Sequence, residues 1–127
     1  MGWRRALSRL LARLRAVPFA LIGLGLMGPV AWIGYRDAAA TEALYHLFFS
    51  RAVAQKCGAM THPAEQGFEV HRDRLVRGAD LPPATVRALR LAGGVAEDRE
   101  WLNRGLGGYR MWCAEEGRAA ASRLSTP

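Results

Sequence analysis

The distribution of apolar and charged positions divides the chain into three parts. Residues 17–35 form a run of 19 without a charged side chain. A bilayer core about 30 Å thick is crossed by about 20 helical residues, so this run predicts one transmembrane helix. We therefore expect a basic arm over residues 1–16, a transmembrane helix over residues 17–35 and a helical domain over residues 36–127.

The arm before the apolar run is both amphipathic and basic. Its apolar side chains recur at the spacing of one helix face: Trp3, Leu7, Leu10, Leu11 and Leu14. Its charged side chains are all arginines: Arg4, Arg5, Arg9, Arg13 and Arg15. Such a helix lies in a membrane surface, and we expect these arginines to contact anionic lipid. The positive-inside rule places this end in the cytoplasm and the C-terminal domain in the periplasm of a bacterial inner membrane.

Two export signals compete with a retained anchor. Ala38-Ala39-Ala40 supplies an A-x-A pattern of the kind found at signal-peptide cleavage sites, so removal of the N-terminal segment stays open. Arg4-Arg5 also resembles the start of a twin-arginine signal. The length of the apolar run and the aromatic Trp32 and Tyr35 at its end favour a retained anchor.

A ridge of small residues follows one face of the predicted span. Its members recur at steps of three and four residues, with one methionine among them: Ala16, Ala20, Gly23, Met27, Ala31 and Gly34. Helices in lipid associate through close backbone approach across such faces. The ridge therefore predicts a helix–helix interface with another integral membrane protein, although small residues are also common in membrane helices that have no partner.

Helical spacing continues through the C-terminal domain and predicts an all-α fold. The expected helices cover residues 37–57, 61–78, 83–92, 97–106 and 109–124. Gly93-Gly94 is expected to end the third of them, because glycine suits the left-handed conformation past a helix end. In the fourth helix, Trp101 and Leu102 are expected to face inward. No stretch alternates apolar and polar residues as a strand would.

Two cysteines, Cys57 and Cys113, are separated by 55 residues. This distance excludes C-x-x-C redox and haem-attachment motifs. In an oxidising periplasm the favoured interpretation is one disulfide joining the first and last helices. Two inert buried thiols and bridges between chains are the alternatives.

Charge and candidate catalytic residues argue against several functions. After the arm, 13 basic and 11 acidic side chains remain, so the folded domain lacks the basic face that nucleic acid would need. His62 and His71 lie about 13 Å apart on one predicted helix, too far to share a metal ion. Glu115 and Glu116 point to different faces, and no nucleophile motif or glycine-rich loop occurs. We expect no catalytic, cofactor or metal site.

The order of features over residues 57–124 resembles a known family. Cys57 is followed by a charged helical stretch, an Ala79-Asp80 turn, Tyr109 and Cys113, with Gly117-Arg118 behind. This order is similar to that of small uncharacterised exported proteins of alphaproteobacteria with a conserved cysteine pair. Three residues separate Cys113 from Gly117 here, where that family tends to have two. The resemblance implies a periplasmic, helical, disulfide-bonded domain without an assigned activity.

Taken together, these patterns predict a protein with one N-terminal transmembrane helix and a small disulfide-linked helical periplasmic domain. The expected function is that of a non-catalytic accessory subunit of an inner-membrane complex, with energy-transducing and transport complexes as candidates. The alternative is an independent binding or enzymatic domain that is exported or tethered to the membrane.

Overall fold

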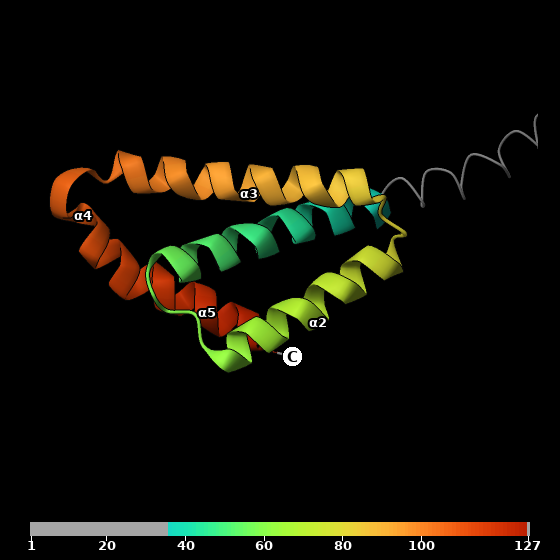
Figure 1. The fold of residues 1–127 in the computed structure, drawn as a ribbon, viewed down its shortest axis with the longest axis horizontal. Helices are drawn as coiled ribbons and strands as arrows, with labels where there is room; N and C mark the ends of the chain where they lie inside the picture. The colour runs from blue at the N-terminus through green and yellow to red at the C-terminus, as the bar shows by residue number, and fades with distance from the viewer. Residues whose placement is uncertain (1–35, 127) are drawn as a thin grey trace, which may run out of the picture. The chain divides into compact units, whose positions relative to one another are not determined.

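The computed structural model describes residues 36–126, and all regular secondary structure in this part of the chain is helical (Figure 1). A first helix covers residues 36–56. It is followed by α2 (His62–Gly78), α3 (Pro83–Asn103), α4 (Gly105–Trp112), a π-helical turn η1 (Cys113–Gly117) and α5 (Arg118–Ser125). The residues from Asp37 onward form one compact unit. The all-α prediction for the C-terminal domain is confirmed over these residues.

The ends of the first two helices follow local chemistry, as the sequence predicts. Gly58, with φ +64°, adopts the left-handed conformation two residues after the end of the first helix. Thr61 caps the start of α2, because its side-chain oxygen accepts a hydrogen bond from the backbone N–H of Ala64 at 3.3 Å. Pro63 occupies the first turn, where a missing N–H costs nothing.

The prediction that a helix ends at Gly93-Gly94 was wrong. Helix α3 runs through both glycines to Asn103, so the two expected helices over residues 83–92 and 97–106 are one. Gly93 lies against the first helix, and a Cβ there would come within 2.9 Å of Phe48 Cβ and of the Phe49 backbone nitrogen. Glycine is therefore required at this position for close helix packing, and the turn comes instead at Gly105, with φ +64°.

The predicted last helix begins earlier than expected and contains an irregular turn. Backbone from Gly105 to Ser125 is helical throughout, with the π-helical turn η1 between α4 and α5. The predicted end near residue 124 agrees with the structure to within one residue. Leu102 was expected to face inward, but it is 76% exposed, because the continuous α3 turns it away from the core.

The core lies where the first helix, α2 and α5 meet. Its largest completely buried side chains come from all three: Phe68, Leu44, Leu124 and Val53. Phe48 and Phe68 bring the first helix against α2, with ring centroids 5.7 Å apart. Much of the remaining core consists of alanine, so the helices pack closely: Ala54, Ala64, Ala79, Ala120 and Ala121.

Cys57 and Cys113 form an intramolecular disulfide, with their Cα atoms 5.1 Å apart. Cys57 follows the first helix directly, and Cys113 begins η1. The bond therefore ties the turn before α2 to the C-terminal helical segment, as the favoured interpretation of the cysteine pair predicted.

Within residues 36–126, no helix has the length and apolar character needed to cross a bilayer. The predicted span over residues 17–35, the small-residue ridge from Ala16 to Gly34 and the lipid-contact arginines from Arg4 to Arg15 lie outside the described residues. These three features stay predictions.

Candidate functional site

The histidines have separate surroundings in the described part of the chain. His46 lies 3.9 Å from Glu42, one turn away on the first helix. The Nε2 atom of His71 lies 2.5 Å from the backbone oxygen of Thr126 and so links α2 to the end of α5. His62 is exposed in the first turn of α2. Among residues 36–126, no three metal-ligand side chains of the His, Cys, Asp or Glu type lie close enough to hold an ion.

A buried carboxylate is the least expected polar group of the described domain. Glu97 on α3 is 5% exposed and points toward the first helix, where Lys56 Nζ lies 3.7 Å from its Oε2. The same ammonium donates a hydrogen bond to Asp98 Oδ1 at 2.9 Å. The second oxygen of Glu97, Oε1, has no hydrogen-bond partner. Glu97 therefore keeps only part of the solvation that a carboxylate has in water.

The position of Glu97 shifts its pKa and that of its partner. Burial raises the pKa of Glu97, and the nearby Lys56 charge opposes this shift only in part. The hydrogen bond to Asp98 raises the pKa of Lys56. Lys56 Nζ also lies 5.4 Å from the centroid of the Trp101 ring, where a cation is favoured.

Substituting Glu97→Gln should change how stability depends on pH. A carboxyl whose pKa is raised by folding holds its proton more tightly in the native state, so native stability falls as the pH rises from the unfolded pKa of about 4.3 through the raised folded value. A glutamine side chain cannot ionise, so the variant escapes this loss. Relative to the unsubstituted protein, we expect the variant to gain free energy of unfolding as the pH rises above about 4.3, until the pH passes the raised pKa of Glu97 in the folded protein.

Urea unfolding of both proteins across this pH range measures the difference. A difference in the free energy of unfolding that stays constant with pH would contradict the assignment of the shift to Glu97.

Aromatic side chains fix the corner between α3 and α4. The Trp101 ring stacks on Tyr109, with centroids 4.8 Å apart, and meets Trp112 edge-on at 6.3 Å. Arg104 lies above the Trp112 ring at 5.5 Å. These contacts orient α4 and so bring Cys113 to the position where it reaches Cys57. Sequence reasoning assigned Trp101 to the interior, and the structure places it partly buried in this cluster.

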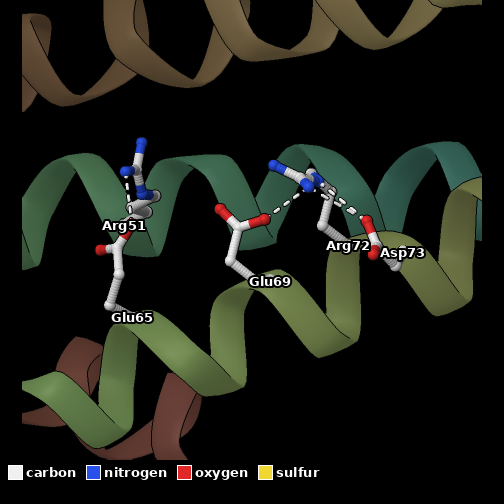
Figure 2. A network of polar contacts seen from close by, with 5 residues as sticks. All are labelled: Arg51, Glu65, Glu69, Arg72 and Asp73. Atoms are coloured by element: carbon white, nitrogen blue, oxygen red, sulfur yellow. Dashed lines mark hydrogen bonds and ion pairs between the residues drawn. The ribbon is translucent and has the colours of Figure 1, made fainter.

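A polar network covers the seam between the first helix and α2 (Figure 2). Arg51 of the first helix donates a hydrogen bond to Glu65 of α2 at 2.6 Å. Arg72 lies between Glu69 and Asp73 on α2 and pairs with both (Figure 2). Arg51 and Arg72 also flank the buried Phe68 ring, at 4.6 Å and 5.8 Å from its centroid. The Arg51–Glu65 pair joins the first helix to α2, whereas the pairs of Arg72 lie within α2 itself.

The outward side of α3 carries three exposed apolar side chains that the sequence pattern did not predict. Leu91, Val95 and Leu102 are 71%, 57% and 76% exposed. Their separations of four and seven residues place them on one side of the helix, opposite Gly93 and Glu97. The sequence predicted two helices in this segment, divided at Gly93. Leu91 and Leu102 share one side only when the helix is continuous, so the prediction did not show the pattern. We call these three residues the outer face of α3.

Within residues 36–126, the main structural features are an internally tied helical core, ion pairs between and along helices, and exposed apolar side chains on α3. In comparisons with known proteins, no family model, no curated protein and no solved structure matches the chain.

Proposed function

We propose that the chain is a non-catalytic, single-span accessory subunit of a bacterial inner-membrane protein complex. The observation that carries this proposal is the run of 19 uncharged residues, 17–35, behind an arm whose only charged side chains are five arginines. In the proposal, the N-terminus lies in the cytoplasm and the helical domain in the periplasm.

The disulfide supports the periplasmic position of the domain. Disulfides persist in oxidising compartments such as the periplasm and are rare in the cytosol. Cys57 and Cys113 are the only cysteines of the chain and pair with each other. A periplasmic, disulfide-bonded helical domain is also what the resemblance to exported alphaproteobacterial proteins implies.

Two surfaces support the role of a subunit. The small-residue ridge of the predicted span suits close packing against another membrane helix. The outer face of α3 presents three large apolar side chains to solvent, and their burial against a partner would be favourable. In the proposal, the ridge packs in the membrane, and the outer face contacts the periplasmic part of the same partner.

Mild detergent extraction followed by native sizing tests this proposal. We expect the full chain to resist alkaline extraction from membranes and to elute as part of a larger complex. A single 14 kDa species in detergent would favour the tethered independent domain, and release of the chain by alkali would exclude the retained anchor.

Substitutions on the ridge should release the subunit without removing it from the membrane. A leucine side chain is favourable in the hydrocarbon core of a membrane, but it is too large to fit where two helix backbones approach closely. Gly23→Leu or Ala31→Leu should therefore abolish co-purification of the partner. Ile22→Ala and Ile33→Ala lie on the opposite side of the predicted helix and should leave co-purification within about twofold. Membrane insertion is measured in parallel by alkaline extraction.

The outer face of α3 provides the second arm of this experiment. Leu91→Glu combined with Leu102→Glu alters exposed side chains only and should leave the domain folded. If co-purification survives the ridge substitutions but is lost in this pair, the interface lies in the periplasm, and the predicted span is only an anchor.

A further inference from the structure

The contacts between helices show which part of the domain lies nearest to the point where the N-terminal segment joins it. On α2, Phe68 meets Phe48 and Glu65 meets Arg51, so α2 runs antiparallel to the first helix. The C-terminal end of α2 therefore lies level with residues 37–40. Gly93 meets Phe48 and Trp101 meets Lys56, so α3 runs parallel to the first helix and begins at this same end. Figure 1 shows the turn between α2 and α3 beside the start of the first helix.

A groove lies at this end, between the last turns of α2 and the first turns of α3. It has a volume of about 450 Å³. Its apolar lining consists of four side chains: Val76, Leu81, Pro83 and Val86. Its charged lining consists of Arg72, Asp73, Arg77 and Arg87. The groove thus combines an apolar floor with a basic rim.

The two outer arginines of the groove are available to a ligand. Arg72 already forms ion pairs with Glu69 and Asp73. Arg77 and Arg87 are exposed, and within residues 36–126 neither forms an ion pair. Between residues 72 and 90 the chain has five arginines and two aspartates, a net charge of +3, whereas residues 37–126 as a whole have 12 basic and 11 acidic side chains. The segment that forms the groove is therefore more basic than the domain as a whole.

We propose that this groove binds the phosphate headgroup of an anionic phospholipid, with Arg77 and Arg87 on the phosphate and the apolar floor against the start of an acyl chain. The inference rests on the proposed membrane anchoring, because the chain leaves the domain toward residues 17–35 at this end. The phospholipid belongs to the leaflet that faces the domain. This site differs from the lipid contact expected at the N-terminal arm, which would lie on the cytoplasmic side.

Solution NMR of the full chain in isotropic phosphatidylcholine bicelles tests the site. Phosphatidylglycerol is added up to about a third of the lipid, and the amide shifts of residues 76–87 are followed. We expect saturable shifts in this segment with phosphatidylglycerol and none with added phosphatidylcholine. An arginine near an anionic surface strengthens binding about fivefold, so Arg77→Gln with Arg87→Gln should weaken the response about 25-fold.

Controls separate the groove from charge in general and from free anions. Arg99→Gln with Arg118→Gln also removes two exposed arginines, outside the groove, and should leave the response within about twofold. Inorganic phosphate added to phosphatidylcholine bicelles should produce a weaker response, because it cannot use the apolar floor. Equal responses to phosphate and phosphatidylglycerol, or an unchanged response in the Arg77 and Arg87 variant, would overturn the lipid site.

The same samples report on anchoring independently. Contacts between the amides of residues 17–35 and lipid acyl protons in bicelles of phosphatidylcholine alone test the anchor without the anionic lipid. Acyl contacts without a groove response reject this inference and leave the proposed function intact. A groove response without acyl contacts rejects the anchor and supports the lipid site.

Discussion

Removing the disulfide should lower the free energy of unfolding by about 4 kcal/mol. Cys57 and Cys113 are 56 residues apart in sequence, and the chain-entropy model assigns a stabilisation of this size to closing such a loop. Cys57→Ser and Cys113→Ser should each produce the loss, measured by urea unfolding under oxidising conditions. The free energy of unfolding of a domain of this size is small, so we expect a loss of about 4 kcal/mol to leave either variant partly unfolded at 37 °C.

The double variant provides the internal control. Both substitutions remove the same constraint, so Cys57→Ser with Cys113→Ser should cost no more than either one alone. Losses that add would show that each cysteine contributes through its own packing instead of through the bond.

Substituting Gly67→Ala should cost about 3 kcal/mol or more, because it would force α5 away from α2. A Cβ at this position would overlap the carbonyl oxygen of Leu124 and come within 2.9 Å of its carbonyl carbon. Backbone atoms cannot rotate aside as a flexible side chain can, so the helices must separate. Their separation would expose Leu124, which is completely buried. Urea unfolding of the oxidised protein measures the cost.

Gly94→Ala is the matched control, because it adds the same methyl group to another helical glycine. No heavy atom lies within 4 Å of a Cβ built at Gly94, in the middle of α3. Alanine loses less backbone entropy than glycine in a helix interior, so this variant should gain about 0.5–1 kcal/mol. A loss at Gly94 as large as that at Gly67 would show that an added methyl group is costly without any contact, and would contradict the assignment of the Gly67 effect to Leu124.

The sequence predicted the helices whose ends depend on neighbouring residues and failed where an end depended on tertiary contact. Thr61, Pro63 and Gly58 act within a few residues of themselves, so α2 and the end of the first helix could be predicted. Gly93 looks like a helix end in sequence, but it serves a contact with Phe48, which lies 45 residues earlier. Local patterns contain no information about such a contact.

The candidate sites show the same division. The cysteine pair could be predicted, since two cysteines allow only one internal bond. The burial of Glu97 could not, because a glutamate followed directly by three more charged residues is typical of a solvated helix surface. The groove with Arg77 and Arg87 requires two helices to meet, and neither helix alone shows it.

The place of α5 in the core has a consequence for the order in which the domain assembles. The side of α2 that bears Ala64, Gly67 and Phe68 is covered by α5, whose Leu124 lies close to the end of the helix. During synthesis this apolar side of α2 stays exposed to other chains until residue 124 has been made and α5 can pack against it. Cys57 likewise remains a free thiol until Cys113 has been synthesised and can form the disulfide with it. A chaperone that shields α2 during this interval would protect the chain from aggregation when it is most vulnerable.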